Sequence, residues 1–280
     1  MTSPSRVSDP GTHWEVRDPR ELALKIRLRA LRMVAPQGFG YLGQALSSAE
    51  QVAAVFAAVR PGLDRLVCSP GHYIIAPFAA AGELGLIDDE ALNTYGQNGS
   101  QLEAIGTERS PVVDYTCGSL GQGLSAAVGF ALSDRLRGRG ARTFAMLSDG
   151  ELEEGQVWEA AMFAAHHGLA GLTVLLDANN SQVDGPVDSI TTIEPIADKW
   201  TAFGWHVADL DGHDLGQIGA ALAEAAEERE RPSVLVCRTS TVHGLDCLPS
   251  DADGHFIKLP PVLAAAAVDE LTRKVEQIHA

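Results

Sequence analysis

The sequence predicts a doubly wound α/β fold, in which a parallel sheet is flanked by helices on both faces. Segments with helical periodicity separate four short apolar runs that do not alternate with polar residues. These runs cover residues 143–147, 172–179, 205–212 and 233–239. Unbroken apolar runs between helices are typical of parallel strands buried on both faces. Because such domains bind ligands beyond the carboxyl ends of their strands, function is expected just after these runs.

Three segments are predicted to be the main helices. Residues 21–34 and 119–140 carry leucine or valine at helical spacing, and they end before a proline and at a glycine respectively. A third helix is expected over residues 47–59, with Ser47 or Ser48 as the N-cap. Alternation of these helices with the apolar runs supports the α/β assignment.

The chain is expected to form a single domain over residues 18–280, preceded by a polar arm over residues 1–17. Its 280 residues are enough for one large α/β domain. The longest segment without periodicity is 244–260, and loops of this length are often functional or mobile.

Composition excludes several classes of protein. Twenty-one basic and thirty-seven acidic residues give a net charge of −16, which disfavours nucleic-acid binding. No apolar run approaches the roughly 18 residues of a membrane span. The four cysteines form no CxxC pair, and the N-terminus lacks the apolar core of a signal peptide. These features predict a cytoplasmic protein with reduced thiols.

Oxygen ligands follow two of the predicted strands. Asp149 comes two residues after the first apolar run ends, and Asn179 ends the second. Mg²⁺ is commonly held by one or two carboxylates, with phosphate and other oxygens in the remaining positions. Together with a backbone carbonyl near Ser181, these side chains could bind Mg²⁺, although Asp-Gly and Asn alone are also common in ordinary turns.

A glycine-containing turn precedes the 119–140 helix. The segment Thr116-Cys117-Gly118-Ser119-Leu120-Gly121 lets backbone N–H groups approach an anion at a helix N-terminus. It is not GxGxxG, so it lacks the fingerprint of a dinucleotide site. A diphosphate bridged to Mg²⁺ fits the turn and the oxygen ligands together.

Several segments resemble the thiamine diphosphate enzymes, and in particular the transketolase branch. SDGELEEGQVWEA followed by Asn179 is similar to the GDG…N signature, while DYTCGSLGQGLSAAVGFAL, FGWHVADLDGHD and SPGHY look like transketolase segments. The likeness runs from about residue 20 to 260 and covers only the first half of a transketolase. It implies the N-terminal, diphosphate-binding subunit of a split transketolase, with thiamine diphosphate and Mg²⁺ as cofactors.

The resemblance also implies roles for individual residues. The metal ligands would be Asp149, Asn179 and Ser181. The cofactor would contact His72, Gly118, Ser119, Leu120, Gly150, Glu151 and Asn179. The catalytic set would be His72, Glu154, Glu159 and His255. Glu154 and Glu159 could instead be acids that favour a helix N-terminus.

One departure from the family pattern bears on the substrate. GYLGQALS resembles the GHLGGSLS segment, but Tyr41 takes the place of a histidine that binds donor oxygens. A neutral phenol is bulkier than imidazole and cannot carry its charge near pH 7. Tyr41 is therefore expected to shift the donor pocket toward a smaller or unphosphorylated donor, or else to fill space while His255 supplies the missing hydrogen-bond donor.

These observations favour a subunit of a two-component enzyme that transfers a two-carbon ketol unit. The missing half of the active site implies a pyrimidine-binding partner subunit in an α2β2 complex, in addition to a small-molecule ketol donor. Small residues at Gly121, Ala126, Ala127 and Gly129 could form the interface or serve internal packing. Transfer to a carrier-protein or lipoyl thiol, and a non-catalytic scaffold subunit, remain alternatives.

Overall fold

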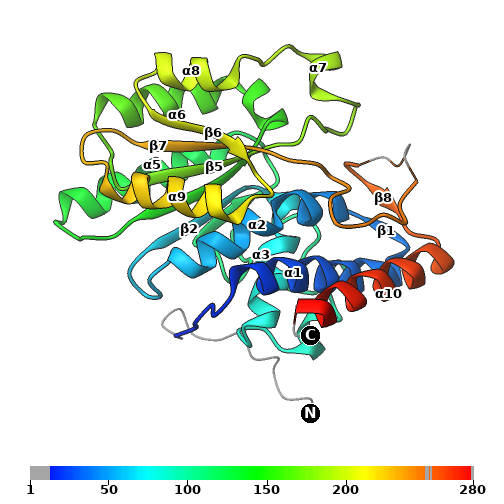
Figure 1. Cartoon of the computed structure of the whole chain (residues 1–280). Coiled ribbons are helices and arrows are strands. Elements are labelled where there is room, and N and C mark those ends of the chain that lie inside the picture. The colour runs from blue at the N-terminus through cyan, green and yellow to red at the C-terminus, as the bar shows by residue number, and fades with distance from the viewer. Residues whose placement is uncertain (1–12, 250–251, 253, 279–280) are drawn as a thin grey trace.

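The computed structural model describes residues 13–249, 252 and 254–278 and has the predicted α/β fold (Figure 1). A six-stranded sheet in the order β3-β2-β4-β5-β7-β6 is parallel throughout. Its strands are β2 (Arg65–Pro70), β3 (Tyr115–Cys117), β4 (Thr143–Ser148), β5 (Leu172–Ala178), β6 (His206–Asp211) and β7 (Ser233–Arg238).

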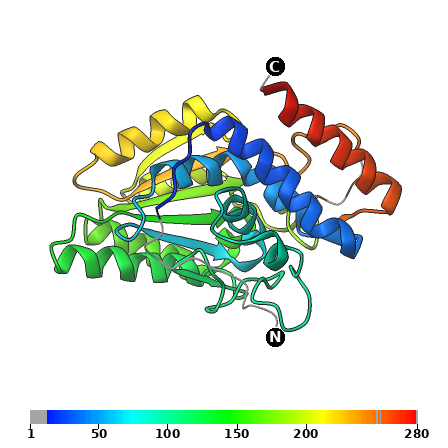
Figure 2. The same cartoon turned by 90° about the horizontal axis from the view of Figure 1, so that it is seen from below.

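Helices cover both faces of this sheet, as Figures 1 and 2 show. One face carries α5 (Gln122–Leu136), α6 (Gly155–His166) and α8 (Ile196–Ala202). The other carries α2 (Leu42–Ala58), α3 (Ile75–Glu83) and α9 (Leu215–Glu227), with α1 (Pro19–Val34) and α10 (Pro261–Ile278) packed outside them. The shorter helical segments are η1 (Ala35–Gln37), η2 (Gly71–Tyr73), α4 (Asp89–Leu92), η3 (Gly150–Glu153) and α7 (Val187–Ile190).

The four predicted strands agree with β4, β5, β6 and β7 to within a residue or two. Every residue of β4 and β5 is buried, as expected for strands covered on both faces. The sequence did not reveal β2, whose apolar run is short and begins with an arginine, or β3, which has only three residues.

The predicted start of the 47–59 helix was wrong. The helix α2 begins at Leu42, and Ser47 and Ser48 are fully buried inside it instead of capping it. Both hydroxyls bond the carbonyl of Gln44 one turn earlier, at 3.3 and 2.6 Å. Serine often caps helices, but a hydroxyl within a helix can satisfy itself in this way.

Two segments distant in sequence meet beside the sheet. β1 (Phe39–Gly40) pairs antiparallel with β8 (Ile257–Lys258), so the long aperiodic segment returns to the start of α2. The backbones are in close contact, because a Cβ atom at Gly43 would lie 1.8 Å from the carbonyl oxygen of Gly254. This contact places residues 254–256 next to the amino-terminal end of α2.

Of the expected N-terminal arm, the described residues 13–17 precede α1. Trp14 packs against Phe56 with ring centroids 5.8 Å apart, and its Nε1–H donates to the Phe56 carbonyl at 3.0 Å. Among the described residues, no helix combines the length and the apolar character needed to cross a membrane.

Candidate active site

The predicted oxygen ligands lie side by side because β4 and β5 are neighbours. Ser148 and Asp177 are in register at the ends of these strands, so Asp149 and Asn179 follow at the same edge of the sheet. Asp149 is 3% exposed and accepts hydrogen bonds from the N–H groups of Gly150 at 2.8 Å and Asn180 at 2.5 Å. The structure therefore brings together the carboxylate and the amide that the sequence suggested.

Asp149 has no ion-pair partner in the part of the chain that the structure describes. Burial raises the pKa of its carboxyl to about 7, and the nearby Asp177 adds to this, whereas the N–H groups of Asn180 and Gly150 act in the opposite direction. A buried carboxylate without a compensating charge is costly. A cation beside it would lower that cost, so the donor set fits a divalent metal ion.

Asn179 is held in a fixed orientation by its neighbours. Its Nδ2 donates to Asp177 Oδ2 at 2.7 Å and to Tyr73 Oη at 2.8 Å. Its Oδ1 accepts the Ser181 N–H at 2.9 Å, which brings Ser181 beside it in a tight turn. Asn180 between them has a φ of 56°, a left-handed conformation that asparagine tolerates better than most residues.

Asp177 is the centre of the polar network and was not among the predicted site residues. Its carboxylate is fully buried and accepts five hydrogen bonds between 2.6 and 2.8 Å. The donors are Ser47, Gln51, Tyr73, Asn179 and Thr239. The sequence signal was the single acidic residue inside an otherwise apolar strand.

The glycine-containing turn joins β3 to α5. Gly118 and Ser119 are exposed and Leu120 is half-buried, so their backbone is accessible. Gly121 has a φ of 82° and forms the N-cap of α5. Gly123 allows α5 to approach β2, since a Cβ atom there would lie 2.4 Å from the Ser69 Cα.

The Glu151 side chain makes two hydrogen bonds within the protein. The carboxylate is fully buried and accepts hydrogen bonds from the Ser69 hydroxyl and from the Gly121 N–H, the latter at 2.7 Å. Burial raises its pKa to about 7. Glu151 therefore fastens the glycine-containing turn to β2, while Gly150 is half-buried beside Asp149.

Three aromatic rings from separate segments meet beyond the sheet. The ring centroids of His72 and His255 are 5.0 Å apart, and Tyr41 lies 5.2 Å from His72 and 5.8 Å from His255. Burial lowers the pKa of His72 to about 3, and the neighbouring His255 contributes to this. His72 is therefore neutral at physiological pH and offers a hydrogen bond without a charge.

Glu154 lies beside the glycine-containing turn, and Glu159 follows on α6. Both are exposed, on η3–α6 and on α6, and neither side chain makes a hydrogen bond or ion pair within the described residues. Of the small residues predicted to form an interface, Ala127 is buried and Gly121 packs against Glu154 and Gln156. Gly129 faces open space on α5, and Ala126 is half-buried.

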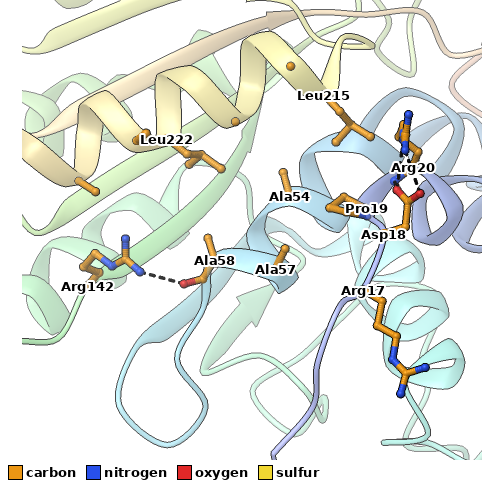
Figure 3. A pocket seen from close by; sticks show the side chains of 14 residues that line it. Arg17, Asp18, Pro19, Arg20, Ala54, Ala57, Ala58, Arg142, Leu215 and Leu222 are labelled. Atoms are coloured by element: carbon orange, nitrogen blue, oxygen red, sulfur yellow. Dashed lines mark hydrogen bonds and ion pairs between the residues drawn. The ribbon is translucent and has the colours of Figure 1, made fainter.

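A separate groove of about 780 Å³ lies between α2 and α9 (Figure 3). Its walls include Ala54, Ala58 and Leu222, and Arg142 at its edge donates to the Ala58 carbonyl at 2.8 Å. The groove is at the carboxyl-terminal end of α2, whereas Tyr41 precedes the amino-terminal end. None of the predicted site residues lines it.

The fold and the polar residues at its strand ends define an α/β domain that binds a ligand beyond the carboxyl edge of a parallel sheet. Residues 19–260 match the family described as transketolase, thiamine diphosphate binding domain. The chain belongs to this family and is a thiamine diphosphate-binding domain.

Relatives of similar length agree with this assignment. A transketolase family protein of Sinorhizobium fredii is 38% identical over 89% of this chain and 93% of its own length. The 6-deoxy-6-sulfo-D-fructose transketolase subunit of Clostridium sp. is 36% identical over 92% of this chain and 97% of its own. The predicted likeness to the diphosphate-binding subunit of a split transketolase is therefore confirmed.

Longer relatives match this chain over less than half of their own length. It covers 42% of human transketolase at 27% identity. The crystal structure of transketolase from Campylobacter jejuni superimposes with a TM-score of 0.83 at 23% identity, over 91% of this chain and 42% of that one. This likeness confirms the fold.

Proposed function

We propose that this chain is the thiamine diphosphate- and Mg²⁺-binding subunit of a two-component transketolase-like enzyme that transfers a two-carbon ketol unit. The observation that carries the proposal is the buried Asp149 carboxylate, which lies beside Asn179 and lacks a compensating charge among the described residues. Asp149, the Asn179 amide oxygen and the Ser181 carbonyl would hold the metal, and Gly118, Ser119, Leu120 and Gly150 would bind the diphosphate.

When bound, thiamine diphosphate supplies the carbon nucleophile that takes up a two-carbon unit. The residues of this chain bind and orient around it. His72 is neutral and partly buried, so it can donate a hydrogen bond to a substrate oxygen where charge develops. The rings of His255 and Tyr41 lie beside that of His72.

Partner dependence is supported by the position of the two glutamates. Glu154 and Glu159 carry exposed carboxylates at the start of α6, with no partner in the described residues. The family resemblance implies that these glutamates act across a subunit boundary, toward the pyrimidine-binding subunit. We therefore propose that the active form is an α2β2 complex in the cytoplasm.

The metal site is tested by the substitution Asp149→Ala. Calorimetric titration of the assembled two-subunit complex with thiamine diphosphate and Mg²⁺ should show binding for the wild type and at least a hundredfold weaker binding for the variant, because the only side-chain anion among the proposed ligands is gone. Asp184→Ala, in the exposed turn after Asn179, is the matched control and should bind normally. Equal affinity for wild type and Asp149→Ala would reject the site.

A further inference from the structure

Gln44 makes a long-range contact that the sequence did not reveal. It lies in the first turn of α2 and is 1% exposed. Its Nε2 atom lies 3.1 Å from the carbonyl oxygen of His255 and 3.2 Å from Nδ1 of the same residue. In the GHLGGSLS pattern the corresponding residue is glycine, which has no side chain to make this contact. The Gln44–His255 pair is therefore a departure from that pattern, as Tyr41 is.

The two contacts together define which amide atom faces His255. A carbonyl oxygen can only accept a hydrogen bond, so the group beside it must be the NH₂ of Gln44. The opposite orientation would set the amide oxygen against the carbonyl oxygen. The orientation is kept although it leaves Gln44 Oε1 buried without a donor in the part of the chain that is described. A buried amide oxygen rarely lacks a hydrogen-bond donor. Because the Gln44 oxygen lacks one, no contact of the oxygen explains the orientation of the amide, and we attribute that orientation to the two contacts of Nε2 with His255.

The same contacts determine the protonation of the His255 ring. The NH₂ group donates one hydrogen to the His255 carbonyl and has a second for Nδ1, and it has no lone pair with which to accept. Nδ1 must therefore be the acceptor and carry no proton. A neutral imidazole with an unprotonated Nδ1 carries its proton on Nε2. An imidazolium would point Nδ1–H at a donor, so the contact also disfavours the charged form.

We propose that Gln44 is a positioning residue that holds His255 in the neutral Nε2–H tautomer. Among the described residues, the titratable rings of His72 and Tyr41 face His255, with centroids 5.0 and 5.8 Å away. In this tautomer the His255 ring is uncharged and carries its proton on Nε2, and the consequence for the ketol substrate rests on the function proposed above. An uncharged N–H group can donate a hydrogen bond to a hydroxyl or carbonyl oxygen of the substrate without bringing a positive charge into the site.

The tautomer can be measured directly in the full chain. Two-bond ¹H–¹⁵N correlation spectra of ¹⁵N-histidine-labelled protein at pH 7 distinguish protonated from unprotonated ring nitrogens, and His255→Gln identifies the His255 signals by their loss. The wild type should show unprotonated Nδ1 and protonated Nε2. Gln44→Met keeps the length of the side chain but removes the donor, and it should shift the tautomer ratio about fivefold to tenfold toward Nδ1–H.

Gln44→Glu tests the sign of the effect. A carboxylate beside Nδ1 can only accept a hydrogen bond, so it favours a proton on Nδ1. In this variant His255 should therefore populate the Nδ1–H tautomer or the imidazolium. Gln51→Met is the matched control, because Gln51 is a fully buried glutamine on the same helix that bonds Asp177 and not His255. It should leave the His255 spectrum as in the wild type.

The proposal is overturned if wild-type His255 carries a proton on Nδ1, or if Gln44→Met leaves the tautomer ratio unchanged. These measurements require neither cofactor nor partner, so they decide the matter even if the complex fails to bind thiamine diphosphate, which would reject only the proposed function. In a complex that turns over a ketol donor, Gln44→Met should lower kcat about tenfold with a smaller change in KM. A change in KM alone would contradict a positioning role.

Discussion

Removing the acceptor at the centre of the polar network should cost a large part of the stability of the chain. In Asp177→Ala, five donors lose this acceptor, and those on Ser47, Gln51 and Tyr73 are buried. An unsatisfied buried group costs about 1–3 kcal/mol. Even at the lower end, the three buried donors sum to about 3 kcal/mol, against a free energy of unfolding of about 5–15 kcal/mol for a typical domain. Asp177→Ala is therefore expected to be strongly destabilised.

Asp177→Asn separates the charge from the shape. One carboxylate oxygen becomes an NH₂ group. Fewer hydrogen bonds are lost if the NH₂ group takes the place of Oδ1 than of Oδ2, because the two groups that face Oδ1, on Thr239 and Gln51, can both turn to accept. The remaining hydrogen bonds lose the strength that a charged acceptor gives, although burial of the charge is also relieved. We expect a folded protein destabilised by about 2–4 kcal/mol, with weaker Mg²⁺-dependent cofactor binding because Asn179 loses a firm anchor.

Urea denaturation followed by circular dichroism measures these differences. Asp209→Asn is the control, since Asp209 lies at the end of β6 in the same sheet but forms a partly exposed ion pair with Arg238 at 2.8 Å. Exposed pairs contribute about 0–1 kcal/mol, so this variant should be close to the wild type. The reasoning is refuted if Asp177→Ala folds with wild-type stability, or if Asp209→Asn costs as much as Asp177→Asn.

Three further predictions concern the donor, the partner and pH. Tyr41→His should improve use of xylulose 5-phosphate by the assembled complex relative to smaller donors; if wild type already prefers xylulose 5-phosphate and the variant does not differ, the specificity argument fails. The purified chain alone should show no ketol transfer, and turnover without a partner would contradict the shared active site. The hydrogen bond from His213 and the charge of Arg27 outweigh burial and lower the pKa of Glu50 from 4.5 to about 2. The stabilisation from Glu50 is thus complete above pH 4.5 and lost as pH falls toward 2, so the stability difference between wild type and Glu50→Gln should shrink over that range; a constant difference in urea titrations would count against it.

The sequence predicted the parts of the fold that depend on local pattern. The strands β4 and β5 were recognised because each is a largely apolar run, and Asp149 and Asn179 were found because they lie at or just after the ends of those runs. The turn before α5 was found from its glycines. These signals lie within a few neighbouring residues, so one sequence is sufficient to read them.

The missed features depend on contacts between distant segments. Asp177 was overlooked because four of its five donors come from three distant segments, and a single acid in a strand gives no sign of them in the sequence. Gln44 carries no signal by itself, since a glutamine in a helix is ordinary and its partner lies 211 residues away. The helix start at Leu42 was missed for a related reason, because buried serines that bond within the helix look like an N-cap in sequence.

The close approach of Gly43 and Gly254 has a practical consequence for altering the substrate range. A side chain at Gly43 would meet the Gly254 carbonyl oxygen at 1.8 Å, and one at Gly254 would meet the Thr241 hydroxyl at 2.0 Å. In a library that randomises the whole loops containing these glycines, most variants would therefore be unable to bring His255 to Gln44. Substitutions at positions 41 and 44, with both glycines kept, would vary the residues next to His255 while preserving the close backbone contact between Gly43 and Gly254.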